Sequence, residues 1–235
     1  MSRSRKPAGR AGRRPSTSAA EISAIGIALF SDRGFEETSV EEVAEAAGIA
    51  RRTFFRYFPS KNAVPWGEFD HHLEQMRAGL DALPGDVSLA EGLRRILIRF
   101  NTFPETEAST HRRRMALILG APSLQAYSML MYTDWRQAIA GYVAGRLSLR
   151  STDHLPQSVA WTMLGVALSS YETWLNDEGA DLHMLLEEGM RVLIEGLGSL
   201  SAVEGPPPAI QAAKEATPCA AGADEAGAYT TESNR

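Results

Sequence analysis

The chain has 235 residues, a formal net charge of −5, 44% hydrophobic residues and a single cysteine, Cys219. A chain of this size holds one large or two modest domains, and one cysteine excludes an internal disulfide. The N-terminus lacks an apolar signal core, and the longest uncharged apolar run, 159–171, is too short to cross a bilayer. These features favour a cytoplasmic protein and predict no membrane segment.

Charge separates the first 61 residues from the rest. Residues 1–61 carry 11 Lys/Arg and 7 Asp/Glu, a net charge of +4, whereas the other 174 residues carry a net charge of −9. A basic part beside an acidic body would orient the molecule on nucleic acid. A solvated basic segment explains the charges equally well, so the choice between the two depends on the motifs.

Residues 1–15 include six basic residues and no acid, which predicts a disordered basic arm. Arg13 and Arg14 lie nearest the folded part and are included among the predicted DNA contacts. Such residues can enter a minor groove beside a helix in the major groove. A flexible arm that raises affinity without sequence preference is the alternative.

A first helix is predicted over 16–33, with Ile22, Ile25 and Leu29 facing inward and Gly34 ending it.

A second helix is predicted to begin at Val40, because Ser39 and Glu42 have the spacing of a capping box. Gly48 supplies the left-handed position that ends it. Its inward stripe consists of Val40, Val43, Ala44 and Ala47.

A third, short helix is predicted over 51–58, with Phe54 and Phe58 on its buried side and Arg52 and Arg56 on other sides. Two helices joined by a tight glycine turn, the second short and basic, are typical of a helix-turn-helix that places its second helix in the major groove. With the first helix they would complete a three-helix DNA-binding head.

This segment resembles the DNA-binding signature of TetR-family transcriptional regulators at 38–39, 47–49 and 53–61. The resemblance implies an all-α protein in which the head is followed by a helical ligand-binding and dimerisation domain. It also implies that the arginines of 51–58 face bases, while the hydroxyl groups and the lysine hold phosphates. Phe55 stands where the family usually has a tyrosine, and Arg52 where a small residue is common. The implied DNA contacts are Thr38, Ser39, Arg51, Arg52, Thr53, Phe55, Arg56, Tyr57 and Lys61.

Within that family, five stretches are similar to the regulators that accompany mycofactocin biosynthesis clusters in actinobacteria. The resemblance covers most of residues 13–198. The stretches are 49–58, 60–72, 101–103, 124–132 and 161–171.

After the head, one helix is predicted over 60–83, with Ser60 as its N-cap and Pro65 opening or kinking it. This helix alone would join head to body and carry a signal between them. Glu68 and His71 have the spacing of a di-iron carboxylate site, but no second Glu-x-x-His follows. We therefore expect no metal and no cofactor.

Further helices are predicted over 88–100, 105–119, 123–146, 156–176 and 181–197. The helix over 156–176 is apolar nearly all round, so it needs cover on every side. Together with 181–197 it predicts a homodimer, which suits a head that binds a palindromic operator.

Large apolar side chains in the body could line the pocket of a small-molecule effector, although such residues are also ordinary core. The run 111–114, one histidine and three arginines, is either a solvated face or a clamp for phosphates. Taken together, the two features make long-chain acyl-CoA thioesters the first effector to test. The candidate pocket residues are Phe100, Phe103, Met115, Tyr127, Met131, Trp135 and Trp174.

The chain shows no catalytic motif, so it is predicted not to be an enzyme. We expect a DNA-binding repressor, released by a ligand, that acts on a nearby operator, with mycofactocin biosynthesis as the suggested system. An all-α enzyme or a helical interaction module is the alternative.

The predicted domain organisation has four parts. They are a basic arm over 1–15, a helix-turn-helix domain over 16–61, a ligand-binding and dimerisation domain over 62–198, and a disordered tail over 199–235.

Overall fold

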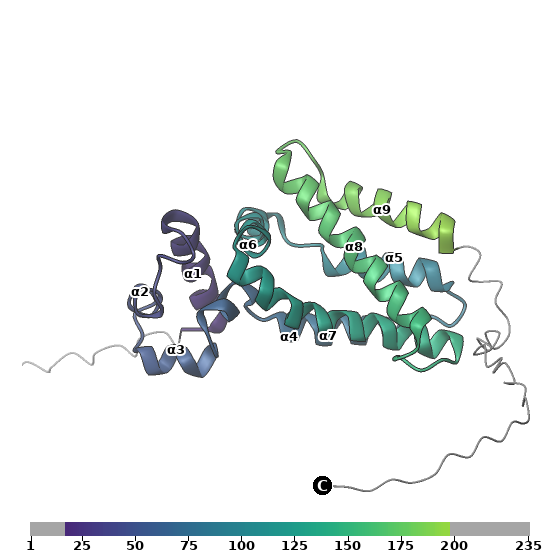
Figure 1. The fold of residues 1–235 in the computed structure, drawn as a ribbon, viewed down its shortest axis with the longest axis horizontal. Helices are drawn as coiled ribbons and strands as arrows, with labels where there is room; N and C mark the ends of the chain where they lie inside the picture. Colours follow the sequence, from purple (N-terminus) through teal and green to yellow (C-terminus); the bar gives the residue numbers. More distant parts are fainter. Residues whose placement is uncertain (1–16, 198–235) are drawn as a thin grey trace, which may run out of the picture. The chain divides into compact units, whose positions relative to one another are not determined.

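The computed structural model describes residues 17–197, and side chains up to residue 195. The predicted arm with Arg13 and Arg14, and the predicted tail over 199–235, lie outside the described residues. Within the described range the chain is helical and contains no strand, which confirms the all-α prediction (Figure 1). The helices are α1 (Ala19–Arg33), α2 (Val40–Ala46), α3 (Arg51–Tyr57), η1 (Lys61–Trp66), α4 (Phe69–Asp81), α5 (Leu89–Phe100), η2 (Glu105–Glu107), α6 (Ala108–Gly120), α7 (Pro122–Leu147), α8 (His154–Asn176) and α9 (Leu182–Leu197).

The helix α2 forms as its capping signals predict. The Ser39 side chain accepts a hydrogen bond from the Glu42 amide at 3.2 Å, and the Glu42 carboxylate accepts one from the Ser39 amide at 2.8 Å. Gly48 has φ +66°, the left-handed conformation that ends the helix and turns the chain into α3. The predicted helix-turn-helix is therefore present.

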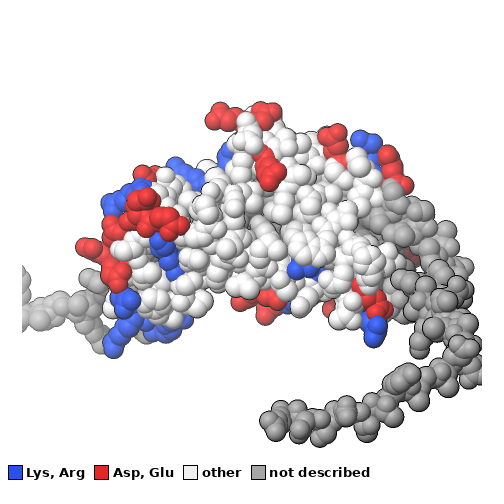
Figure 2. Space-filling model, in the orientation of Figure 1, with Lys and Arg blue, Asp and Glu red and all other residues white. Residues whose placement is uncertain are grey.

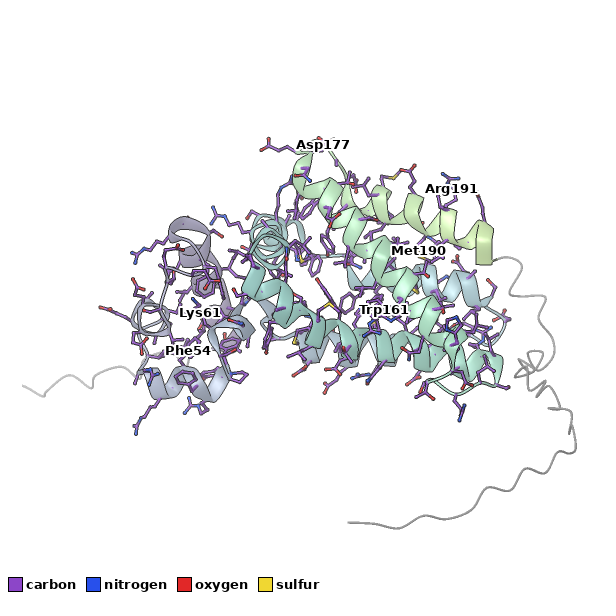
Figure 3. The ribbon with its side chains drawn as sticks, viewed as in Figure 1. Phe54, Lys61, Trp161, Asp177, Met190 and Arg191 are labelled. Atoms are coloured by element: carbon purple, nitrogen blue, oxygen red, sulfur yellow. The ribbon has the colours of Figure 1, made fainter. Side chains whose placement is uncertain are left out.

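We call α1, α2 and α3 the head, and its core is a cluster of aromatic and branched side chains. Phe54 is fully buried and Phe58 nearly so, as the sequence predicts. Phe54, labelled in Figure 3, lies on the side of α3 that packs against the rest of the head. Ile25 and Leu29 of α1 are only half-buried. The inward face of α1 is rotated because η1 and α6 contact this helix as well as α2.

The segment after the head differs from the single helix predicted over 60–83. It forms the 3-10 helix η1, a break at Gly67 with φ +54°, and then α4. Pro65 removes a backbone donor inside the segment, and Ala63, Val64, Pro65 and Trp66 are all buried, so contacts with the head override the helical pattern. Ser60 makes no side-chain capping bond.

The segment η1 docks closely on α1. Gly26 permits this approach, since a Cβ at that position would lie only 2.5 Å from Val64 Cγ1. Ser23 of α1 donates a buried hydrogen bond of 2.7 Å to the Val64 carbonyl.

We call α4 to α9 the body, and it surrounds a second hydrophobic cluster. In this cluster α7 packs on α4 and α8, and α9 packs on α5 and α8 (Figure 1). The helix α6, seen nearly end-on in Figure 1, contacts α1 as well as α7 and α8. The link after the head is therefore not the only direct connection between head and body. None of the described helices is long and apolar enough to cross a membrane.

Candidate nucleic-acid interface and body cavity

The exposed side of α3 carries basic side chains. Arg51, Arg52 and Arg56 are all exposed, and Figure 2 shows Lys and Arg gathered over α3 with Asp and Glu over the neighbouring part of the head. Arg51 pairs with Glu41 at 2.5 Å, and its guanidinium lies 5.0 Å from the Phe55 ring centroid. Arg52 has no ion-pair or hydrogen-bond partner within residues 17–197. The helix thus offers at least one free guanidinium to an anion.

Two of the predicted DNA contacts make hydrogen bonds within the protein. Thr38 is buried, and its hydroxyl donates to the Gly34 carbonyl at 2.8 Å. The Lys61 ammonium donates to the carbonyls of Phe35 at 2.7 Å and Thr38 at 3.1 Å. Both side chains thus serve carbonyls in and beside the loop between α1 and α2, which need donors, and their contact with DNA stays a prediction. Figure 3 labels Lys61 beside the head.

The remaining hydroxyl groups of the predicted surface are partly engaged. Tyr57 donates its single proton to the Thr17 carbonyl at 2.7 Å, so it has none to give to a phosphate in this arrangement. Ser39 is occupied by the cap of α2, and Thr53 is half-buried. Phe55 is 42% exposed beside the arginines. The side of α3 that could enter the major groove of DNA is therefore formed by Arg51, Arg52, Phe55 and Arg56.

The body contains a cavity of about 100 Å³ with a largely aromatic lining. Of the predicted pocket residues, Phe100, Phe103, Met115 and Trp135 line it. Tyr127, Met131 and Trp174 do not. On α7 the residues that face inward are Ser128, Tyr132 and Trp135. Tyr127 and Met131 each precede one of these residues, so their side chains point about 100° away from the inward direction. Prediction by residue type missed Trp66, Phe69, His111, Arg114, Tyr132 and Tyr171, which also line the cavity.

A buried hydrogen-bond chain crosses one wall of this cavity. The Asn101 amide donates to the Leu97 carbonyl at 2.8 Å, which leaves its oxygen to accept from the Tyr171 hydroxyl at 2.7 Å. Tyr171 has then given away its proton, so His111 donates to it from Nε2 across 2.9 Å. Burial, and secondarily the charge of Arg114, lowers the pKa of His111 to about 3. The ring is therefore neutral at physiological pH.

The three consecutive arginines of α6 do not form a clamp. Arg112 donates to the Trp174 carbonyl at 2.6 Å and stacks on the Trp174 ring at 4.6 Å, so it caps the end of α8. Arg113 is exposed, and Arg114 lines the cavity. Successive residues on a helix point about 100° apart, so a run of three cannot converge on one phosphate group.

Apolar side chains remain exposed on α8 and α9. Trp161 is 46% exposed, Met184 64% and Val192 62%. Trp161 is labelled in Figure 3. The guanidinium of Arg136, on α7, lies 3.7 Å from the centroid of the Trp161 ring. Met129 and Leu130 of α7 are exposed as well. Since α8 and α9 pack against each other, their exposed apolar side chains make these two helices a candidate interaction surface.

Acidification should destabilise the protein through His111. The unfolded residue takes up a proton near its ordinary pKa of 6.5, whereas the folded one stays neutral down to about 3. Stability is therefore full above pH 6.5 and falls below it, by about 2 kcal/mol at pH 5. Urea unfolding at pH 7 and pH 5 measures this loss.

The matched variant is His111→Gln, whose amide can still donate to Tyr171 but does not titrate. Its loss of stability between pH 7 and pH 5 should be smaller than that of the unaltered protein by about 2 kcal/mol. Identical losses in the two proteins would contradict the neutral, buried state of His111.

Two protein-family models match the chain. The model "Bacterial regulatory proteins, tetR family" matches residues 22–64, and the model "MftR C-terminal domain" matches residues 87–198. Among curated proteins, the chain is 52% identical over 192 residues to the candidate mycofactocin biosynthesis transcriptional regulator MftR of Mycobacterium tuberculosis, covering 82% of this chain and 97% of that protein. It is 33% identical over 149 residues to the HTH-type transcriptional regulator EthR of Mycolicibacterium smegmatis, covering 60% and 67%.

Solved structures share the fold at low sequence identity. FadR of Bacillus subtilis, determined in complex with stearoyl-CoA, superposes with a TM-score of 0.55 at 16% identity, covering 74% of this chain and 97% of that one. A TetR-family regulator from Syntrophomonas wolfei gives a TM-score of 0.58 at 11% identity, covering 77% and 94%.

Proposed function

The chain belongs to the TetR family of transcriptional regulators, and from that premise we propose that it is a repressor that binds a palindromic operator as a homodimer and leaves it when a small molecule occupies the body. The observation that best supports DNA binding is the exposed basic face of α3, because the opposite side of this helix is buried in the core of the head. The head over 16–61 would bind DNA, and residues 62–198 would bind the ligand and the second subunit. Such a regulator acts in the cytoplasm, and its role is binding rather than catalysis.

The proposed operator lies next to genes of mycofactocin biosynthesis. Its support is the name and the 52% identity of the Mycobacterium tuberculosis relative. A gel shift with the DNA upstream of the chain's own gene, against a scrambled fragment of equal length, tests this proposal. Equal affinity for the two fragments would show that the chain has no operator there.

The proposed dimer forms through α8 and α9. Their exposed Trp161, Met184 and Val192 would be covered by the same face of a second subunit, as a two-fold axis requires. Two copies of α3 would then meet half-sites about 34 to 36 Å apart, one turn of the duplex.

Arg52→Ala and Arg56→Ala should relax sequence specificity. An arginine that donates two hydrogen bonds to guanine contributes about 1 to 3 kcal/mol of discrimination at one base pair, and alanine loses it. Binding of each variant to the operator and to single-base operator variants measures the effect. The control is Arg113→Ala, an exposed arginine on α6.

The control variant should bind every fragment as the unaltered protein does. If the two α3 variants lose the same affinity for operator and scrambled DNA, their arginines contact phosphates and the base-contacting surface lies elsewhere.

The effector proposed first is a long-chain acyl-CoA thioester. The aromatic and methionine lining suits a flexible acyl chain, and the FadR structure with stearoyl-CoA has this fold. A benzene molecule fills a cavity of about 150 Å³, so a chain of twelve or more carbons requires the 100 Å³ cavity to widen. The ligand would thus favour a body conformation different from the one that places two heads on the operator.

Reciprocal coupling tests this effector. If the thioester weakens operator binding by some factor, operator DNA must weaken thioester binding by the same factor. Calorimetric titration of the thioester into the protein with and without operator measures both sides. A thioester that binds equally well in the two titrations is not the effector, whatever its affinity.

A further inference from the structure

The charge of Arg114 has no partner inside the body. Arg114 lines the cavity, and no acid lies within ion-pair distance of it in residues 17–197. Its Nε is buried and makes no hydrogen bond to any of these residues. Glu107 is the acid whose charge acts on it, from beyond contact distance. Arg114 is half-buried, and a guanidinium does not give up its proton in a protein, so an anion in the cavity would compensate its charge.

Other donors at the same cavity also lack acceptors. Within the described residues, Trp66 Nε1 and the Tyr132 hydroxyl are buried without hydrogen-bond partners, and both residues line the cavity. His111 Nδ1 is also buried without a partner and, as the unprotonated nitrogen of the ring, can only accept. Three donors, one of them charged, against one acceptor in a mostly apolar lining match a ligand that carries an oxyanion. A carboxylate fits, because each of its two oxygens accepts more than one hydrogen bond.

The size of the cavity limits the apolar part of that ligand. About 100 Å³ is somewhat less than the cavity of about 150 Å³ that holds benzene. Phe69, Phe100 and Trp135 contribute flat apolar walls. Without the widening that a long acyl chain requires, this cavity admits a ligand about the size of a single ring or a short alkyl chain.

We propose that the cavity binds a compact carboxylic acid, aromatic or short-chain aliphatic, as its anion, and that the carboxylate pairs with Arg114. This inference rests on the proposed function only for its regulatory consequence, since binding itself requires no operator. It names a ligand class different from the thioester, in which the carboxylate is masked.

The position of Arg114 connects such a ligand to the head. A Cβ at Gly67 would lie 3.9 Å from Arg114 Nη2 and 3.3 Å from the Ser23 hydroxyl. Gly67 is the break between η1 and α4, and Ser23 belongs to α1. An anion that draws the guanidinium toward the cavity would change the contacts at this break, which is one of the places where head and body meet.

The probe for the test is benzoate, titrated into the full-length protein by calorimetry and by tryptophan fluorescence, because Trp66 and Trp135 line the cavity. Benzyl alcohol has a similar ring without the charge, benzylamine reverses the charge, and benzoyl-CoA masks the carboxylate as a thioester. Hexanoate tests a short aliphatic acid. Benzoate or hexanoate should bind at least about 10-fold more tightly than benzyl alcohol, and benzylamine should not bind.

Arg114→Gln should reduce the affinity for the carboxylate at least about 10-fold, and Arg114→Lys should retain part of it. The matched control is Arg113→Gln, an exposed neighbour on the same helix, which should bind as the unaltered protein does. Circular dichroism establishes that all three variants are folded.

Equal binding of benzoate and benzyl alcohol, preference for benzoyl-CoA, or failure of both acids to bind would overturn the inference while leaving operator binding intact. If a carboxylate binds through Arg114 but the gel shift with operator does not change, the ligand class stands, and release by this ligand is excluded.

Discussion

Operator binding should weaken by about 10³- to 10⁵-fold when the salt concentration rises from 50 to 200 mM, as expected for roughly 6 to 10 phosphate contacts. The proposed dimer would bring two copies of the exposed basic face of α3 and two copies of residues 1–15, each with six basic residues and no acid, to the phosphates. Each cation that meets a phosphate releases counterions, so the logarithm of the affinity falls linearly with the logarithm of the salt concentration.

Fluorescence anisotropy with labelled operator at four or five salt concentrations gives this slope. The control is a scrambled fragment, which should show a similar slope at lower affinity, because phosphate contacts do not depend on sequence. A nearly flat plot for the operator would contradict an interface in which basic side chains neutralise phosphates.

Phe54→Ala should lower the stability of the head by about 3 to 5 kcal/mol, whereas Phe55→Ala should cost less than about 1 kcal/mol. The two residues are adjacent on α3, but Phe54 is fully buried and Phe55 is 42% exposed. Phe54 also packs against Phe58, with ring centroids 5.7 Å apart. Removal of the Phe54 ring leaves a cavity at the centre of the head that the short α3 cannot close.

Thermal unfolding followed by circular dichroism compares the pair. The midpoint should fall by about 6 to 20 °C for Phe54→Ala and by a few degrees at most for Phe55→Ala. Equal shifts would mean that the two rings contribute equally to the core, contrary to their burial.

Local signals made the helices of the head and body predictable. Ser39 and Glu42 set the start of α2 through contacts within four residues, and Ser88 does the same for α5 by accepting from the Glu91 amide at 3.2 Å. Gly48 ends α2 because of its own backbone freedom. Such features need no knowledge of the rest of the fold.

Tertiary contacts decided what the sequence did not reveal. The break at Gly67 follows from the docking of η1 on α1, and the inward turn of Lys61 follows from carbonyls that lie some 25 residues away in the chain. The acidic or basic character of a residue does not show whether its side chain points outward.

Only part of the cavity lining could be predicted, because tertiary contacts also decide which side chains face the cavity. Residue type singled out Phe100 and Trp135, which line it, but also Trp174, which instead stacks with Arg112. His111 and Arg114 lie in a basic run whose ordinary interpretation is a solvated face. Three residues apart on α6, they share the side that faces the cavity.

The close packing of η1 on α1 sets the boundary for transplanting the DNA specificity of this chain onto another regulator. A graft that ends at residue 61, where the helix-turn-helix pattern ends, would leave Gly26 and Ser23 facing a foreign segment in place of Val64. A side chain larger than valine there has no room above Gly26, and the buried Ser23 hydroxyl would depend on a new acceptor. The exchangeable unit therefore extends through Trp66, and Gly67 is the natural junction of a chimera.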